Sequence, residues 1–357
     1  MAQSAISRNP NPALDLLRVL AAAMVLLVHA GQAAGLDSVT WVGGNGVLLF
    51  FILSGHLTMA SLDRQFKPGA YYAGRARRIL PLYWLVLAVR FVFDSVGYLA
   101  GGMPAGQVFG PNGPCGPRYL RYVFFLQMWL PSEDWMLWNN RNALWTMSAF
   151  AFFYLLAPWL RRLLEGLDLR FAAGRFWGSF ALLLACLGGK GLLGRAIEQT
   201  LTALPAGSVD NISEFSAKNP PMELYAFLFG VTLFYAVKEG RGLLYGGFCL
   251  LLPMAFGFER MAWEGVFTVL VLLAVCLPCR VRPGGRAQRA VHFLSAGSFF
   301  LYLAHPMLLP FFPVLEPGGG LARWGYLAGI LAVCLAVCYL LYGLAVRRFE
   351  ALFARRR

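Results

Sequence analysis

The residues of this sequence with the clearest chemical potential are histidines and arginines set within or beside long apolar runs. His29, His56 and His305 are three of its four histidines. Ionisable side chains at membrane depth are costly and usually face a cavity or a partner. His29 follows Arg18 by 11 residues, so on one helix the two share a face roughly 16 Å apart. Imidazole moves protons near neutral pH, which makes His29 a candidate base, although a hydrogen bond between helices would also explain it.

A second candidate site is the basic cluster Arg75, Arg77 and Arg78, which directly precedes an apolar run beginning at Ile79. We expect these arginines in a loop at the entrance to a helix. Planar guanidinium groups grip phosphates with two parallel hydrogen bonds. Retention of the loop in the cytoplasm and contact with lipid headgroups are the alternative explanation.

A third feature is the glycine-rich stretch from Gly43 to His56. Glycines let helix backbones approach closely, so Ser54-Gly55 predicts a tight helix contact inside the bilayer. Taken alone, this stretch is a packing motif. A covalent intermediate on Ser54 or on a histidine is an alternative to direct group transfer, but no carboxylate–histidine relay stands beside Ser54 in the sequence.

The elements that must position these residues are membrane-spanning helices. The chain is 59% hydrophobic and only 13% charged over 357 residues, with a mean hydropathy of +0.60, which is outside the range of soluble domains. Backbone polar groups in lipid must be satisfied internally, so runs of about 20 apolar residues predict helices. The sequence therefore predicts an all-α, polytopic integral membrane protein with about ten spans, at residues 14–34, 45–61, 79–99, 142–160, 176–194, 222–238, 243–258, 262–279, 292–312 and 323–346.

The distribution of basic residues predicts the orientation. If both termini are cytoplasmic, the inner segments carry 21 of the 31 lysines and arginines and the outer segments carry 7. This asymmetry explains the net charge of +14 as a topology signal and an attraction to anionic lipids, so no nucleic-acid partner is expected. Asp15 and Arg18 interrupt the first apolar run, which argues against a cleaved signal peptide.

The chain is expected to form a single transmembrane domain over residues 1–357. The outer segments 100–141 and 195–221 are too short for an added soluble domain, and the apolar stretch 119–130 is too short to cross, which suggests a re-entrant or interfacial helix. The seven cysteines lie mostly within predicted spans and are expected to pack. Cys276 and Cys279 lack a second ligand pair, so no metal site is expected.

Read in order along the chain, these segments resemble the membrane-bound acyltransferase type 3 family, bacterial enzymes that O-acylate surface and exported carbohydrates. The resemblance covers most of the chain, and its strength lies in six motifs in the family's order. They are Leu14-Asp15-Leu16-Leu17-Arg18 with His29, Gly46 to Gly55, Arg75-Ala76-Arg77-Arg78 with Pro81-Leu82-Tyr83-Trp84, Leu144-Trp145-Thr146-Met147-Ser148 with Phe153-Tyr154-Leu155-Leu156, Glu223 to Gly230, and Ser298 to Pro306.

Two positions depart from the family's pattern. The family usually has an acidic residue between Ser148 and Phe153, where this chain reads Ala149-Phe150-Ala151. Many relatives also have a polar residue in the second-helix motif at the position that Leu48 occupies here. The missing polarity could come from other residues, and the candidates are His56, Asp15 and Glu223.

The resemblance implies transfer of an acyl group, expected to be acetyl, from acyl-coenzyme A on the cytoplasmic side to a hydroxyl of a periplasmic or membrane-associated carbohydrate or glycolipid. It implies a bacterial cytoplasmic (inner) membrane location. Arg75, Arg77 and Arg78 would hold the nucleotide phosphates of the donor, and His29 would deprotonate the attacking hydroxyl. Arg18 would anchor the donor or stabilise charge at the thioester carbonyl.

Further residues of the matching motifs are candidates for substrate binding or support. Ser54, Trp145, Tyr154, Tyr302 and His305 belong to this group, and Tyr302 and His305 would either hydrogen-bond the acceptor or brace helices. Outer aromatic residues would either stack on sugar rings or form an interfacial belt, and they are Tyr119, Trp129, Trp135 and Trp138.

Two other functions suit the same composition. A transporter or flippase for a lipid-linked or exported glycan would have a similar number of helices with few buried charges. A non-catalytic assembly partner for such a glycan would tolerate the missing carboxylate. The transporter or flippase would require neither coenzyme A nor His29.

Overall fold

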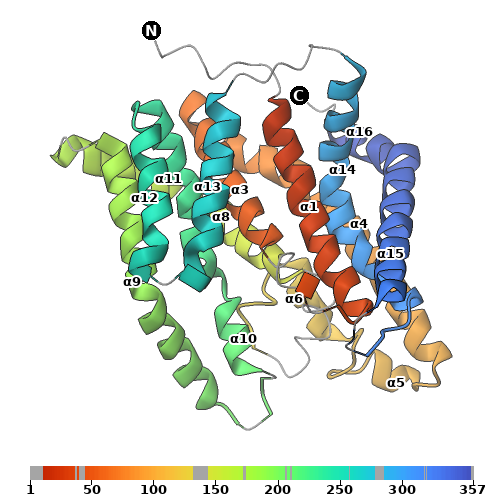
Figure 1. Ribbon diagram of the computed structural model, residues 1–357. Coiled ribbons are helices and arrows are strands. Elements are labelled where there is room, and N and C mark those ends of the chain that lie inside the picture. The colour runs from red at the N-terminus through yellow and green to blue at the C-terminus, as the bar shows by residue number, and fades with distance from the viewer. Residues whose placement is uncertain are drawn as a thin grey trace.

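The computed structural model describes residues 11–36, 38–39, 45–131, 144–171, 174–205, 207–209, 211–256, 258–277, 285–316, 318 and 320–354. Within these ranges the chain is a bundle of long helices with no β-strand, as Figure 1 shows. The all-α prediction is therefore confirmed, and the protein is a multi-pass membrane protein.

Ten long helical segments correspond to the ten predicted spans. They are α1 (Pro12–Ala33), α3 (Gly46–Arg64), α4 (Pro68–Ala100), α8 (Trp145–Phe171), α9 (Gly174–Thr202), α11 (Leu224–Lys238), α12 (Gly242–Phe256), α13 (Phe258–Cys276), α14 (Arg286–Leu308) and α15 (Leu321–Leu341). The last continues through a π-helical turn, η4 (Tyr342–Val346), into α16 (Arg347–Ala354).

Seven of the helical segments in the described ranges are long and apolar enough to cross a bilayer. The apolar parts of α12 and α13 are shorter than the length needed to cross a bilayer, so these two helices are not among the seven. Helix α8 is not among them either. The count of ten spans and the cytoplasmic placement of both termini therefore stay predictions.

Two local predictions need correction. Helix α4 begins at Pro68, not at Ile79, so the arginine cluster lies on the first turns of a helix instead of a loop. Proline at the first position suits a helix start because its missing N–H would have no partner there. The stretch 119–130 is helical only in η1 (Pro117–Tyr119) and α6 (Leu120–Val123), and it continues as turns.

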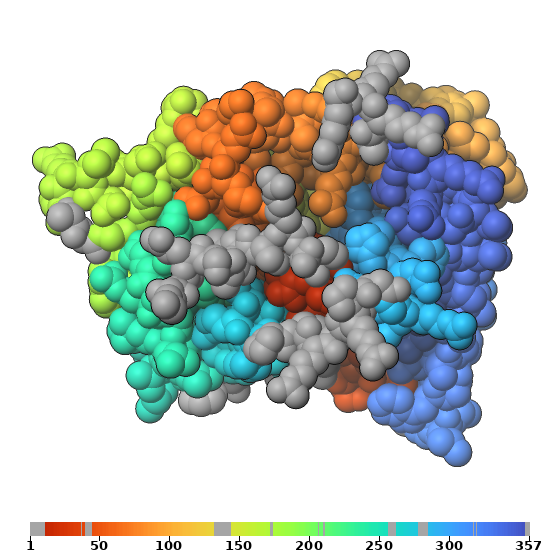
Figure 2. All heavy atoms as spheres, turned by 90° about the horizontal axis from the view of Figure 1, so that it is seen from above, coloured from red at the N-terminus to blue at the C-terminus, as the bar shows by residue number. Residues whose placement is uncertain are grey.

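Helix α1 lies between two apolar cores. One face of α1 packs into a cluster with α3, α8, α9, α11, α12 and α13, and the opposite face packs into a cluster with α4, α14 and α15. Figure 2 shows the red α1 near the centre of the face viewed from above. Side chains on α1 therefore face the interior of the bundle on two sides, where polar groups can meet residues of other helices.

The glycine motif makes a tight contact between α3 and α11. A Cβ atom at Gly55 would lie 2.1 Å from the carbonyl oxygen of Phe227, and one at Gly230 would lie 1.9 Å from that of Ile52. Both distances are far below van der Waals contact, so the two glycines set how closely the helices approach. The predicted packing role of Gly55 is confirmed.

Candidate active site

Helices α1 and α14 run side by side in the same direction and define the two ends of the candidate site. Asp15 contacts His292 and Ser295 near the start of both helices, whereas His29 contacts His305 near their ends. Asp15 and His29 are 14 residues apart, or about 21 Å along the axis at 1.5 Å per residue.

At the far end of this helix pair, His29 and His305 form a pair of imidazole rings. Their centroids are 5.3 Å apart with the planes tilted by 32°. The ring nitrogen Nδ1 of His29 lies 3.3 Å from Oε1 of Gln32, one helical turn later. With the amide oxygen as the acceptor, Nδ1 carries the proton and Nε2 retains the lone pair that a base needs.

His305 is fully buried behind His29. Its Nδ1 donates to the Leu301 carbonyl oxygen at 2.9 Å, which leaves Nε2 as the acceptor, and among the described residues that nitrogen has no hydrogen-bond partner. The next residue, Pro306, has no N–H, so the helical hydrogen-bond ladder is interrupted beside the ring. Tyr302, one turn earlier, shares a hydrogen bond with Thr146 and so joins α14 to α8.

At the near end, Asp15 is a buried carboxylate with three partners. Its Oδ1 accepts from Arg18 Nη1 at 2.7 Å and from Ser295 Oγ at 2.9 Å, and Oδ2 lies 3.4 Å from His292 Nδ1. Paired and hydrogen-bonded charges are those that a protein interior tolerates. Arg18 is thus fixed on α1 with its charge compensated, and its guanidinium also interacts electrostatically with Arg78 and Tyr154.

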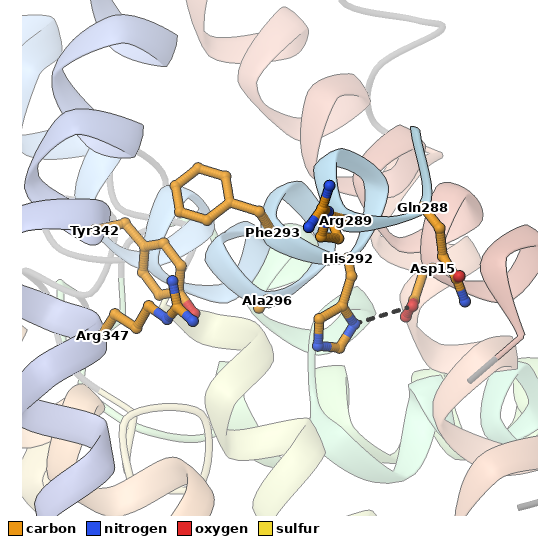
Figure 3. Close-up of a pocket in the computed structure, with 8 residues that line it drawn as sticks. All are labelled: Asp15, Gln288, Arg289, His292, Phe293, Ala296, Tyr342 and Arg347. Carbon is orange, nitrogen blue, oxygen red and sulfur yellow. Dashed lines mark hydrogen bonds and ion pairs between the residues drawn. The ribbon is translucent and has the colours of Figure 1, made fainter. Parts of the chain in front are cut away.

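A cavity of about 480 Å³ opens beside Asp15, and Figure 3 shows its lining. Most of the lining comes from α14, and the rest comes from α1, η4 and α16. The lining residues are Asp15, Gln288, Arg289, His292, Phe293, Ala296, Tyr342 and Arg347.

The three arginines of α4 have different surroundings. Arg75 is half-buried and turns inward, where Nη2 donates to Thr58 Oγ1 at 3.0 Å and the guanidinium carbon lies 4.6 Å from the centre of the Tyr154 ring. Arg77 and Arg78 are exposed. Arg78 interacts electrostatically with Tyr342 at the cavity and with Glu350 on α16, so it lies on the cavity side of the bundle.

Ser54 and Tyr154 are joined by a 2.8 Å hydrogen bond between their hydroxyl groups. No acid or histidine hydrogen-bonds to this pair among the described residues. His56, one helical position beyond Gly55, is buried with its ring centroid 5.9 Å from that of Phe234, and its Nδ1 has no partner in the described part of the chain. These positions favour helix packing over nucleophilic catalysis for Ser54.

At the positions on α8 where the family usually has an acid, this chain has apolar residues that border an aromatic cluster. Ala149 is fully buried, and the Phe150 ring lies 5.0 Å from that of Phe51 and 5.9 Å from that of Tyr154. Leu48 is likewise buried in the apolar core. No carboxylate is needed to fill this space.

Among the candidate substitutes for the missing acid, Glu223 lies on the 3₁₀ turn η2 (Pro220–Glu223) and His56 on α3, and both of these elements pack against α8. Glu223 interacts electrostatically with Lys190, Lys218 and Glu264. Lys218 also interacts with His29 and lies 5.7 Å from the centre of the Trp145 ring. Lys218 therefore interacts with Trp145, with Glu223 and with His29. Asp15 instead bonds to residues at the other end of the α1 and α14 pair.

Several residues at these ends were not among the sequence candidates. They are Gln32, Thr146, Lys190, Lys218, Glu264, Arg289, His292, Tyr342 and Arg347. Lys190 and Glu264 carried a signal, since both are charged residues inside predicted spans. Trp135, Trp138 and Cys279 lie outside the described residues, as do Gly43 and Gly44.

The described residues contain no group of three or more histidine, cysteine, aspartate or glutamate side chains that could hold a metal ion. The arrangement consists instead of a cation-rich cavity at one end and an imidazole pair at the other. Comparison with known proteins identifies the chemistry. A family described as acyltransferase domain matches residues 11–343 of the chain. The chain belongs to this acyltransferase family.

Individual relatives of this acyltransferase are distant. The exopolysaccharide production protein ExoZ of Rhizobium meliloti is 27% identical over 289 residues, which cover 78% of this chain and 80% of the relative. The acyltransferase MdmB of Streptomyces mycarofaciens is 24% identical over 379 residues, covering 97% and 93%. Nodulation protein 10 of Rhizobium leguminosarum is 25% identical over 171 residues, covering 41% and 43%. No solved structure matches the acyltransferase.

Proposed function

We propose that this acyltransferase moves an acyl group, acetyl in the simplest case, from cytoplasmic acyl-coenzyme A to a hydroxyl of an exported or membrane-associated carbohydrate, in the bacterial inner membrane. The observation that carries the proposal is the pairing of α1 with α14, which separates a cation-rich cavity from the His29 and His305 pair by about 21 Å along one helix. An extended pantetheine arm can span that length.

The donor enters from the basic end of the bundle. The starts of α1 and α14 lie at the same edge as α16 in Figure 1, and Arg77 and Arg78 are exposed at the start of α4. Basic segments are retained in the cytoplasm, where acyl-coenzyme A is found. Arg75, whose contacts are internal, holds α4 to α3 and α8.

The acyl group is transferred directly at His29. The hydroxyl oxygen of the acceptor attacks the thioester carbonyl carbon, so a C–O bond forms and the C–S bond breaks. The hydroxyl proton passes to Nε2 of His29 and then to the departing thiolate, which leaves as free coenzyme A. Gln32 holds the imidazole in the tautomer that this step requires.

Arg18 supports the donor side of the reaction. Its charge is held on α1 by Asp15 and interacts with Arg78, so it favours a phosphate arriving from that side, whereas the thioester carbonyl at His29 is too far away for Arg18 to contact. A single hydroxyl without a base nearby, as at Ser54, would be a poor acyl carrier.

The acceptor class rests on the relatives. One is named for exopolysaccharide production, one is named an acyltransferase, and one is named a nodulation protein. Trp145 and Glu223 offer an aromatic face and a carboxylate, two kinds of group that bind sugar rings and hydroxyls, and both interact with Lys218, which also interacts with His29.

Mass spectrometry of surface glycans from cells with and without the gene tests the proposal. We expect loss of an acyl mass increment while the glycan is still exported, with the increment restored by the wild-type gene and not by His29→Ala. Loss of the whole glycan from the surface would instead indicate a transporter or flippase. An unchanged glycan profile would refute an exported acceptor.

A further inference from the structure

The cavity beside Asp15 has the size and setting of a ligand site. At about 480 Å³ it falls within the usual range of small-molecule pockets. It is framed by three separate parts of the chain, namely α1, α14 and the segment from η4 to α16. In Figure 3 the rings of Phe293 and Tyr342 lie on one side and Asp15 with His292 on the other.

The charge of the lining favours an anion. Arg289 and Arg347 line the cavity, and within the described residues neither guanidinium has a hydrogen bond or an ion pair. Among the described residues of the lining, Asp15 is the single acid, and both of its oxygens already have partners in Arg18, Ser295 and His292. Guanidinium groups left without partners at a cavity are suited to bind phosphate.

The aromatic residues favour a planar group beside that anion. The Phe293 and Tyr342 rings are 5.5 Å apart and inclined by 58°. The Tyr342 hydroxyl donates to Glu350 at 3.4 Å, which holds the ring in place. Nucleobases stack on aromatic and guanidinium faces whatever their identity, because every base has a π-face.

A backbone irregularity places Tyr342 and Arg347 together. Tyr342 is the first residue of the π-helical turn η4 and Arg347 directly follows its last, and in this turn hydrogen bonds join residues five apart. In a regular α-helix residues five apart point about 140° away from each other. The wider turn brings them to one side of the helix, and such turns occur often at functional sites.

We propose that this cavity binds the phosphorylated nucleoside end of the acyl-coenzyme A donor. Arg289 and Arg347 bind its phosphates, and Phe293 and Tyr342 pack against its base. Arg78, which interacts electrostatically with Tyr342, adds positive charge at the same place. The inference rests on the proposed donor, and it moves the nucleotide away from Arg75, whose side chain is bound to Thr58.

Binding to the purified full-length protein in neutral detergent tests the assignment. The probes are coenzyme A and adenosine 3′,5′-bisphosphate, which is its nucleotide end alone. We expect both to bind the wild-type protein. Arg289→Ala and Arg347→Ala should each weaken coenzyme A binding about tenfold or more, since hydrogen bonds to charged groups contribute on that scale.

Two kinds of control separate the site from general charge. Arg286→Ala and Arg348→Ala remove the same charge from positions that are exposed, as Arg289 and Arg347 also are, but that do not line the cavity. These two variants should change the affinity less than twofold. Ala296→Phe fills the cavity without changing its charge and should abolish binding of adenosine 3′,5′-bisphosphate. Each variant is first checked for an unchanged elution profile and melting temperature.

The outcomes distinguish this site from the proposed function. If the wild type binds coenzyme A and the cavity variants bind it equally well, the cavity assignment is overturned and the donor stands. If the wild type does not bind coenzyme A, the proposed donor fails and this inference fails with it. A third outcome would show that the site holds a lipid headgroup and would overturn the proposal. In that case adenosine 3′,5′-bisphosphate does not bind, and phosphatidylglycerol raises the melting temperature of the wild type but not that of the cavity variants. Phosphatidylcholine has no such effect.

Discussion

Replacing His29 by alanine should remove acyl transfer while leaving donor binding intact. His29 lies about 21 Å along α1 from Asp15 and the cavity beside it, so the change is remote from the cationic lining. Among the described residues His29 makes one hydrogen bond, to Gln32, and a ring contact with His305, and it interacts electrostatically with Lys218. The variant should therefore fold and insert as the wild type does.

The size of the effect follows from the role of the ring. A positioned general base contributes about 10²- to 10⁴-fold, which corresponds to about 3–5 kcal/mol of barrier at 1.36 kcal/mol per factor of ten. Gln32 acts only through His29 by one 3.3 Å hydrogen bond near the surface, worth about 0.5–1.5 kcal/mol. Gln32→Ala should therefore lower the rate by only about two- to tenfold.

The assay compares acyl content of the surface glycan over time in a deletion strain that carries each variant at matched expression. Val28→Ala changes a side chain one position earlier, which points about 100° away on the helix, and serves as the control for local packing. We expect the order of rates to be wild type and Val28→Ala, then Gln32→Ala, then His29→Ala. A His29→Ala rate within tenfold of wild type would refute its role as the base. Equal losses for Val28→Ala and His29→Ala would show that packing, and not proton transfer, is affected.

Three further predictions follow from the packing. Gly55→Val should lower the melting temperature of the detergent-solubilised protein, because the new side chain would clash with the Phe227 carbonyl and overpacking costs about 1–3 kcal/mol. Gly247→Val is the control, since a Cβ there meets nothing within 4 Å, and it should leave the melting temperature unchanged. Equal melting temperatures for the two variants would contradict the tight contact at Gly55. Arg75→Ala should lower the melting temperature more than Arg77→Ala, since Arg75 bonds Thr58 across helices, and the reverse order would contradict this. Phe150→Glu should reduce folded yield without raising activity, because it places a charge between the Phe51 and Tyr154 rings; a gain in acyl transfer would show that the missing acid matters.

Periodicity and composition were enough to locate the helices because each span must satisfy its own backbone in lipid. All ten predicted runs coincide with helical segments, and the glycine motif correctly predicted a close helix contact at Gly55. The boundaries were less reliable. Apolarity begins at Ile79, but α4 starts at Pro68, because a helix can extend beyond the bilayer with polar residues on its surface. For that reason the sequence analysis wrongly placed Arg75, Arg77 and Arg78 in a loop before the helix.

Composition and apolar runs predicted a multi-pass helical membrane protein, and the resemblance to a known family implied acyl transfer and pointed to Arg18, His29, Tyr302 and His305. Those conclusions need only residue types, local spacing and the order of motifs along the chain. Which of these residues meet depends on the tertiary structure. His29 and His305 are 276 positions apart and come together because α1 and α14 run in parallel, and the same parallel pairing brings His292 to Asp15. The cavity beside Asp15 is lined by Arg289 and Arg347, which the sequence placed outside the predicted spans, where they looked like ordinary orientation signals. Their convergence follows from helix packing and one π-helical turn, which local sequence does not specify.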